Sequence, residues 1–509
     1  MNCRPSRASA PHNRPFGRVT RSDLQTLEPP PVLFNSYEFL FGFLPVVLIG
    51  FYLTSMVSRM GAAAWLGLAS LFFYAWWSWA ALPLLCGSIF VNYAFGRMIV
   101  RAAGGSRRRA VLTLSLGANL ATLGFFKYSN FFLQTVNSVA GDAIGRVEPL
   151  NIVLPIGISF YTFTQIAFLV DCYQGKVKEP RLVHYLLFVS YFPHVIAGPV
   201  LHHAQMMPQF ADAQTYRPSA SRFAAGIALF SIGLAKKLLI ADPNGFVANR
   251  MYDAPGAPDF FRAWNGTLSY AFQIYFDFSG YSDMALGLSL LFGIRLPINF
   301  DSPYRATSII DFWRRWHMSL SNFLRDYLYV PLGGNRHSMR RRYINLMITM
   351  VLGGLWHGAS WTFVVWGALH GFYLVVNHVW RGLRGAAHHT GPAQRAARWL
   401  LTFVAVCFAW VFFRAGSFGD ATQILRGMVG LNGVGWGLKW SHPWAYIVVA
   451  FALALFPWNS NAIAGRIERW RGGRWAVAGS SGLAIGALLM FSVMRIAGGG
   501  SPQFLYFQF

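Results

Sequence analysis

The chain has 509 residues, of which 55% are hydrophobic and only 12% are charged, and its mean hydropathy is +0.39. Soluble domains usually carry about 25% charged residues, so this composition excludes an ordinary soluble protein and favours a polytopic membrane protein. The formal net charge is +25. Because the basic residues cluster in short loops between apolar runs, we interpret them as cytoplasmic anchors facing anionic lipid, not as a nucleic-acid-binding surface.

Residues 1–31 differ from the rest of the chain. They contain five Arg together with several Pro and Ser and no apolar run, and the apolar sequence starts abruptly at Val32. Two interpretations are open: a disordered basic cytoplasmic tail, or translation that begins at Val32, which would make the preceding residues an annotation artefact. We favour the second. Residues 32–509 are expected to form a single membrane domain, since no internal repeat is visible.

Apolar runs long enough to span a bilayer recur along the chain. They lie near 34–57, 62–78, 80–99, 110–128, 149–170, 184–204, 266–292, 343–362, 363–380, 399–414, 443–458 and 475–495. A further run at 220–240 contains Lys236 and Lys237, and two adjacent lysines sit poorly at mid-bilayer, so we expect a re-entrant or interfacial helix there. The basic loops, expected on the cytoplasmic side, are 97–109, 171–183, 305–342, 381–398 and 466–474. The predicted fold is an all-α polytopic membrane bundle of about 11 to 13 transmembrane helices.

The loop 305–342 carries a helical pattern of its own. Ser308 and Asp311 have the spacing of a capping box, and aromatic and aliphatic residues recur at helical spacing from 309 to 328. The basic residues fall on another face. We therefore expect one amphipathic helix at the cytoplasmic interface, or dipping into the bundle. The side chains of interest on it are Arg314, Arg315, Trp316, His317 and Arg325.

The stretch "GGLWHGASWTFVVWGALHG", from 353 to 371, places two histidines in apolar and aromatic sequence. Ionisable groups at membrane depth usually face the bundle interior and mark a pathway or a site; the alternative is a packing histidine bonded to a neighbouring helix. If a turn falls near Ser360–Trp361, His357 and His370 could face one cavity from adjacent helices, together with Trp356.

Two carboxylates, Asp277 and Asp283, lie in the otherwise apolar run 266–292. They either bind a ligand or pair with basic groups of the 305–342 loop, and we favour pairing. No metal site is expected, because the four cysteines lack CxxC spacing and the histidines near 194–203 show no convergent ligand geometry.

Taken together, several segments resemble the membrane-bound O-acyltransferase family, closest to its bacterial alginate O-acetylation branch. Relatives that acetylate cellulose or peptidoglycan, or that move D-alanine, share much of this pattern. The matching segments are "LFNSYEFLFGFLP" (33–45), "LPIGISFYTFTQIAFLVD" (154–171), "YFPHVIAGPV" (191–200), "FDFSGYSDMALGLSLLFGIRLPINFDSPY" (276–304), "DFWRRWHMSLSNFLRDYLYVPLGGNR" (311–336), "GGLWHGASWTFVVWGALHG" (353–371) and the closing "FLYFQF".

The resemblance implies a funnel-shaped helical bundle with a narrow central passage, an acyl donor on the cytoplasmic side and an acceptor hydroxyl on the outer side. The family's essential histidine matches His357, and its second characteristic polar residue matches His317. The implied activity is O-acetylation from the bacterial inner membrane, with alginate, cellulose or peptidoglycan as acceptor, or a serine of a periplasmic partner protein that carries acetyl onward. No cofactor is expected to stay bound; acetyl-CoA or another acyl thioester is the co-substrate.

In this interpretation His357 acts as a general base on the acceptor hydroxyl or in relay of the acyl group. Indole N–H groups or His317 would stabilise the oxyanion. Arg314, Arg315 and Arg325 suit the phosphates of a coenzyme A thioester, although anionic lipid headgroups explain them equally well. The rival interpretations are a transporter, and a scaffold without acyl-transfer chemistry.

Overall fold

The computed structural model describes residues 33–140, 147–177, 181–254, 256–384, 391–435, 442–469, 475–497 and 504–505. All regular secondary structure in these ranges is helical, as predicted. The N-terminal tail lies outside the described residues, so the choice between a basic tail and a start at Val32 stays open.

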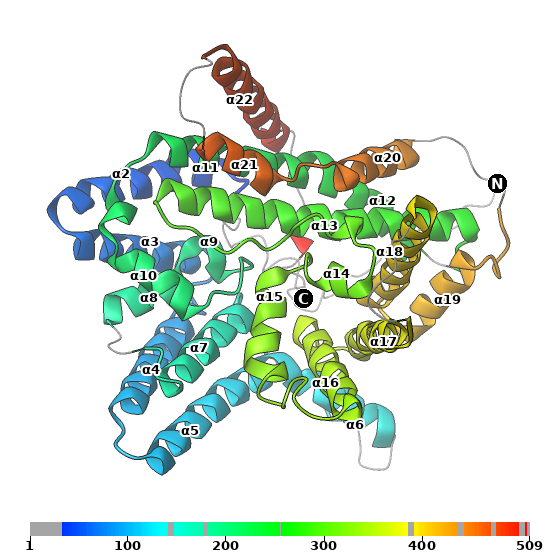
Figure 1. Ribbon diagram of the computed structural model, residues 1–509, viewed down its shortest axis with the longest axis horizontal. Helices are drawn as coiled ribbons and strands as arrows, with labels where there is room; N and C mark the ends of the chain where they lie inside the picture. The colour runs from blue at the N-terminus through cyan, green and yellow to red at the C-terminus, as the bar shows by residue number, and fades with distance from the viewer. Residues whose placement is uncertain are drawn as a thin grey trace, which may run out of the picture.

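The first half of the chain forms helices at the left and bottom of Figure 1 and further helices that lie against the central one. They are η1 (Glu38–Phe43), α2 (Leu44–Val57), α3 (Arg59–Trp77), α4 (Leu82–Arg101), α5 (Gly105–Leu123), η2 (Gly124–Tyr128), α6 (Ser129–Ala140), α7 (Ile158–Tyr173), α8 (Leu182–Ser190), α9 (Phe192–Val195), α10 (His203–Ala211), η4 (Ala213–Tyr216), α11 (Ala220–Ala235), η5 (Lys236–Ala241) and α12 (Asp242–Tyr252).

The second half supplies the central helix and the helices next to it. They are α13 (Phe260–Leu291), η6 (Pro303–Arg305), α14 (Ile309–Trp313), α15 (Met318–Leu324), η7 (Arg325–Tyr329), α16 (Met339–His357), α17 (Trp361–Arg384), α18 (Pro392–Arg414), α19 (Phe418–Met428), α20 (His442–Leu455), α21 (Ser460–Glu468) and α22 (Trp475–Ala497).

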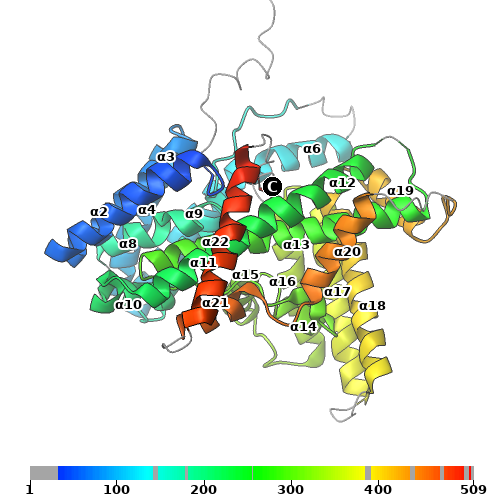
Figure 2. The ribbon, with the colours of Figure 1, turned by 90° about the horizontal axis from the view of Figure 1, so that it is seen from above.

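Helix α13 crosses the middle of the molecule and contacts α9, α11, α12, α18, α19 and α20 (Figures 1 and 2). Every residue from Ile274 to Leu291 is buried. Glycines permit its closest approach: a Cβ on Gly280 would lie 2.7 Å from the carbonyl oxygen of Gly233 on α11, and a Cβ on Gly233 would lie 2.6 Å from that of Gly280. Small residues at helix crossings let backbones come this close, so α11 and α13 form one rigid pair.

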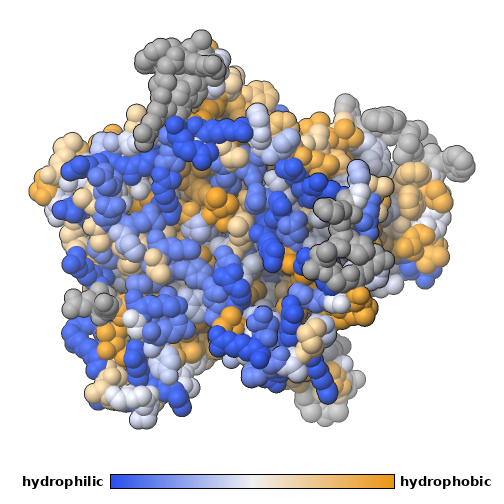
Figure 3. All heavy atoms as spheres, in the orientation of Figure 1, coloured by the Kyte–Doolittle hydropathy of each residue, from blue (hydrophilic) through white to orange (hydrophobic). Residues whose placement is uncertain are grey.

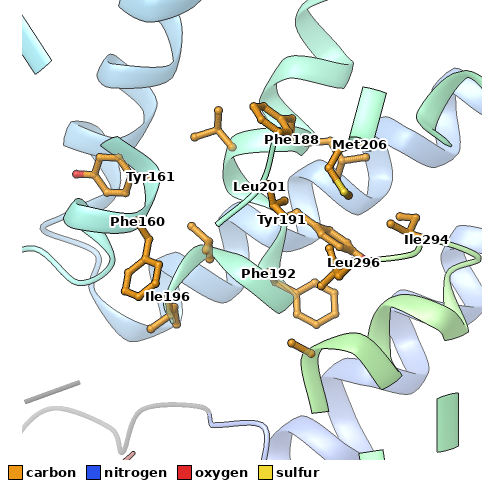
Figure 4. Close-up of a cluster of buried hydrophobic side chains, with 14 of the residues drawn as sticks. Phe160, Tyr161, Phe188, Tyr191, Phe192, Ile196, Leu201, Met206, Ile294 and Leu296 are labelled. Atoms are coloured by element: carbon orange, nitrogen blue, oxygen red, sulfur yellow. The ribbon is translucent and has the colours of Figure 1, made fainter. Parts of the chain in front are cut away.

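A buried apolar cluster packs the helices α7, α8, α9 and α10 against the segment that follows α13 (Figure 4). The short helix α9 lies within it, and its aromatic side chains pack against neighbours from both sides. The labelled members are Phe160, Tyr161, Phe188, Tyr191, Phe192, Ile196, Leu201, Met206, Ile294 and Leu296. The predicted span at 184–204 is therefore wrong as one helix, because the chain breaks between α8, α9 and α10 to fill this core.

Eight helices in the described ranges are long and apolar enough to cross a membrane, or nine if the bent pair Pro443–Leu455 and Ser460–Glu468 counts as one span. This is fewer than the 11 to 13 expected. The continuous helix Ala220–Tyr252, predicted to be interfacial, is among the eight. Part of the shortfall comes from runs such as 149–170 and 184–204, whose helices in the structure are shorter than a span.

Hydrophilic and hydrophobic residues occupy different parts of the surface, as expected for a membrane protein. The face seen in Figure 3 is mostly hydrophilic, and hydrophobic residues gather toward its edges. Figure 2 shows α14 and α21 toward one edge of the molecule and α6 at the opposite edge. The outer helices α2 and α22 expose large apolar side chains, which suits contact with lipid. These include Val46, Ile49, Leu53, Met56, Leu483, Met490 and Met494.

The carboxylates of α13 pair with the lysines of η5, and the expected pairing with the 305–342 loop was wrong. Lys236 Nζ lies 2.6 Å from Asp283 Oδ2, and Lys237 Nζ lies 2.7 Å from both Asp277 Oδ1 and Asp242 Oδ1. Charges inside a bundle are tolerated when they pair with one another. The two adjacent lysines therefore do not require an interfacial helix.

The predicted amphipathic helix is interrupted. Ser308 caps α14 as expected, with its Oγ accepting the N–H of Asp311 at 3.2 Å, but α14 ends at Trp313. The chain then turns through His317, whose φ of +44° is left-handed, before α15 begins. Arg315 and Arg325 already form ion pairs, with Asp311 and Asp301 and with Asp326 respectively.

Replacing Lys237 with Met should leave Asp277 and Asp242 without their cation and destabilise the fold by about 3–5 kcal/mol, the usual cost of breaking a buried ion pair. The matched control is Arg325→Met, which removes an exposed arginine paired with the exposed carboxylate of Asp326 and should cost less than about 1 kcal/mol. Thermal unfolding of the purified proteins measures the difference. Equal melting temperatures for the two variants would contradict the structural role of the buried pair.

Candidate active site

Helix α16 delivers His357 to the interior at its last residue. Gly358 follows in an extended conformation and α17 starts at Trp361, so the turn predicted between the two histidines is present. The two helices cross tightly, because a Cβ on Gly354 or Gly367 would lie 2.3 Å from a backbone carbonyl oxygen of the other helix. Larger residues there would separate α16 from α17.

The ring of His357 is enclosed by aromatic side chains. Its centroid lies 4.9 Å from that of Trp356, 5.2 Å from Trp366 and 5.3 Å from Phe413, and the residue is 6% exposed. The surroundings are therefore poor in water. In such a site fixed dipoles and hydrogen bonds act more strongly than they would in solvent.

His317 comes to the same place from the break between α14 and α15. The residue is fully buried, and its ring centroid lies 6.3 Å from that of His357. The structure thus brings together the two histidines that the family resemblance singles out. Burial lowers the pKa of the His317 imidazole to about 3, so the ring is uncharged at neutral pH.

Asn299 fixes which nitrogen of His317 carries the proton. Asn299 Oδ1 lies 3.1 Å from His317 Nδ1, and the same oxygen accepts from Ser319 Oγ at 2.9 Å. Asn299 Nδ2 donates to Ser282 Oγ at 3.2 Å, which agrees with this amide orientation. Since an oxygen only accepts, the neutral ring must donate through Nδ1, and its Nε2 is then the basic nitrogen.

His370 has the opposite tautomer. Trp313 Nε1 donates to His370 Nδ1 at 3.3 Å, so the neutral ring carries its proton on Nε2. The ring is fully buried, and its centroid lies 4.8 Å from that of Trp366. It belongs to the aromatic surroundings of His357, since Trp366 contacts both imidazoles.

Three buried nitrogen donors surround this centre without a hydrogen-bond partner among the residues that the structure describes. They are Trp356 Nε1, Trp366 Nε1 and His370 Nε2. Buried polar groups are nearly always hydrogen-bonded. Donors of this kind next to an imidazole are suited to a substrate oxygen that carries developing negative charge.

Other predicted site residues lie elsewhere. Asp277 and Asp283 belong to the lysine pairs described above. Trp316 is buried and packs on Phe300 and Trp410, at centroid distances of 5.1 and 5.0 Å, so it supports the wall that carries Trp366.

Sequence reasoning missed Asn299 and Lys127. Asn299 lies in irregular chain after α13, where no periodicity marks it. Lys127 is a single cation in an apolar run, a signal that could have been found. It contacts the end of α16 through the carbonyl oxygens of Trp356 and His357.

Residues 111–417 match the model of the family described as "MBOAT, membrane-bound O-acyltransferase family". This chain belongs to that family. It is therefore a multi-pass membrane O-acyltransferase, and the matched range includes His317, His357 and His370. The resemblance drawn from the sequence motifs is confirmed.

Curated relatives carry acyltransferase names. A "Peptidoglycan O-acetyltransferase" of Helicobacter pylori is 45% identical over 79% of this chain and 81% of its own length. A "Probable alginate O-acetylase" of Azotobacter vinelandii is 44% identical over 78% of each chain. A "Teichoic acid D-alanyltransferase" of Streptococcus thermophilus is 26% identical over 61% of this chain and 82% of its own length.

Replacing Asn299 with Ala should release the Nδ1 proton of His317 and allow the other tautomer. If His317 assists the transfer, the acyl-transfer rate should fall about 10²-fold, the lower end of what a positioned proton acceptor contributes. Initial rates in purified protein measure this. The control is Ser282→Ala, which removes the acceptor of Asn299 Nδ2 and leaves the bond between Asn299 Oδ1 and His317; similar rates in both variants would contradict the role of the tautomer.

Proposed function

We propose that this protein is an inner-membrane O-acetyltransferase that takes acetyl from cytoplasmic acetyl-CoA and passes it outward for O-acetylation of an extracytoplasmic polysaccharide. The observation that carries the proposal is the buried pair His317 and His357, at 6.3 Å between ring centroids, next to unpartnered indole donors. The names of the relatives support acetyl as the group transferred.

The residues can supply each proton movement of the transfer. His357 takes the proton from the acceptor hydroxyl as its oxygen attacks the thioester carbonyl carbon, and a C–O bond forms while the carbonyl oxygen becomes an oxyanion. The intermediate then collapses, the C–S bond breaks, and the thiolate leaves. The imidazolium of His357 returns the proton to the thiolate, so the products are an O-acetyl ester and coenzyme A.

The indoles are better oxyanion donors than His317. The hydrogen bond with Asn299 uses the Nδ1–H of His317 and makes Nε2 an acceptor in the neutral ring. Trp356 and Trp366 instead keep their N–H groups available beside His357. We assign these indoles to the oxyanion, and His317 to orienting the acceptor hydroxyl or receiving a proton.

Of the three arginines predicted to meet the phosphates of the donor, two are already engaged in ion pairs. Arg315 and Arg325 are held by carboxylates. Arg314 is exposed and forms no ion pair within the described ranges. It is therefore the arginine best suited to meet a phosphate without first breaking a salt bridge.

The acceptor has two candidates with support from relatives, alginate and peptidoglycan. A serine of a periplasmic partner protein could carry the acetyl group to either. Membranes containing the chain, supplied with radiolabelled acetyl-CoA and each polymer in turn, distinguish them. Label in neither polymer nor any co-purifying protein would contradict the proposal.

Replacing His357 with Ala should lower the rate of acetyl transfer about 10²–10⁴-fold, because the base is lost while the aromatic surroundings remain. The control is His337→Ala, which removes an exposed histidine and should leave the rate unchanged. Label transfer is measured at equal amounts of folded protein in membranes. Retained transfer by the His357 variant would remove this residue from the catalytic role.

Replacing Trp366 with Phe keeps an aromatic ring, smaller than the indole, and removes the N–H. If this donor contacts the oxyanion, kcat should fall about 10²–10³-fold while the KM for acetyl-CoA stays unchanged. Trp361→Phe is the matched control, since Trp361 begins the same helix, is exposed, and donates to Thr135 Oγ1. A rise in KM with unchanged kcat would assign Trp366 to binding instead.

A further inference from the structure

Lys127 is a cation in an apolar stretch. It lies in η2, inside the helical segment 105–140 that is long and apolar enough to cross a membrane. Its side chain is partly buried, and within the described ranges no carboxylate lies at ion-pair distance from it. A charge in such a position is costly without partners, so its actual contacts indicate what it does.

The contacts of Lys127, and of Tyr128 next to it in the chain, lie at the end of α16 or beside it. Lys127 Nζ donates to the carbonyl oxygen of Trp356 and, at 3.3 Å, to that of His357. The following residue, Tyr128, donates its hydroxyl to the carbonyl oxygen of Leu355 at 2.9 Å. Two consecutive side chains of η2 therefore satisfy the last three carbonyl groups of α16.

The carbonyls at a helix C-terminus have no partner within the helix. In a membrane there is no water to satisfy them, so other protein groups must. A cation is also favourable there because the C-terminal end of a helix carries partial negative charge. The ammonium of Lys127 meets both needs and also lies 5.8 Å from the ring centroid of Trp356. Nζ is 3.4 Å from Ser159 Oγ on α7, which ties α7 to the same point.

We propose that Lys127 is a positioning residue for acyl transfer, which holds the main chain of Trp356 and His357 so that base and oxyanion donor keep their places. This inference rests on the proposed function. One ammonium fixes the residue that supplies the imidazole and the residue that supplies an indole N–H. Since displacement of about 1 Å at a reacting centre can cost 10²-fold in rate, loss of the cap should reduce kcat and leave binding of the donor unchanged.

The first test compares Lys127→Met with Ser129→Ala. Ser129 is one helical turn from Phe125, whose carbonyl its hydroxyl contacts, and it makes no bond to α16. With labelled acetyl-CoA, the Met variant should lose kcat by about 10²-fold with KM unchanged, and the Ala variant should match the wild type. Equal kcat values in the two variants would overturn the proposal.

A merely structural role is separated by restoring the amine. Lys127→Cys, alkylated with 2-bromoethylamine to thialysine and verified by mass spectrometry, should recover most of the lost kcat. The same reagent should leave wild type unchanged. Failure of the verified thialysine protein to recover activity would contradict the role of the ammonium.

Hydrogen–deuterium exchange tests the cap without relying on catalysis. Peptides covering 350–362 should exchange faster in Lys127→Met than in Ser129→Ala, because the end of α16 is released. Unchanged exchange would overturn the cap even if the wild type is active. An inactive wild type with the exchange difference present would contradict the proposed function and leave the cap supported.

Discussion

The candidate active site depends on two helix interruptions inside the protein. Helix α16 stops at His357, and the 305–342 segment turns at His317 through a left-handed backbone conformation. Each interruption frees polar backbone groups that lipid cannot satisfy. Asn299 secures the interruption at His317, since its main-chain oxygen accepts from Met318 N at 2.9 Å and its side chain binds His317. Lys127 and Tyr128 secure the other.

The rigid centre behind these interruptions is the α11–α13 pair. Glycine contacts bring the two helices together, and the lysine–aspartate pairs between η5 and α13 lock their register. The segment that follows α13 then carries Asn299 to His317. The position of His317 thus depends on a helix pair whose charges are already matched to one another, so the two carboxylates in the membrane run have a structural explanation.

Much of this could be predicted from the sequence. The apolar runs followed from composition, a turn near Ser360–Trp361 was expected between the two histidines, and the family motifs singled out the two histidines that the structure brings together, His317 and His357. The break at His317 could not, because residues 308–328 keep helical periodicity without a glycine or proline. Tertiary contacts with Asn299 override that local pattern. The partner of Asp277 was also misassigned, since a lysine on a neighbouring helix leaves no signature in local spacing.

The proposed chemistry combines the uncharged ring of His317, the enclosed imidazole of His357 and the unpartnered indole N–H groups of Trp356 and Trp366. Each of these features alone has an ordinary structural explanation in a membrane protein. Together they provide an acceptor for a proton and donors for an oxyanion within one aromatic enclosure. This arrangement needs a reacting carbonyl to arrive between them, and the family assignment supplies a reason for one to do so.

The most direct measurement is the position of that carbonyl. A cryo-EM structure of the purified protein with a non-transferable thioether analogue of acetyl-CoA should place the acyl carbonyl carbon about 5 Å from the His357 ring, so that an acceptor oxygen bonded to the imidazole can reach it. Its oxygen should point toward Trp356 or Trp366. A bound analogue whose acyl group ends far from His357, with the imidazole closed off behind its aromatic neighbours, would contradict the account.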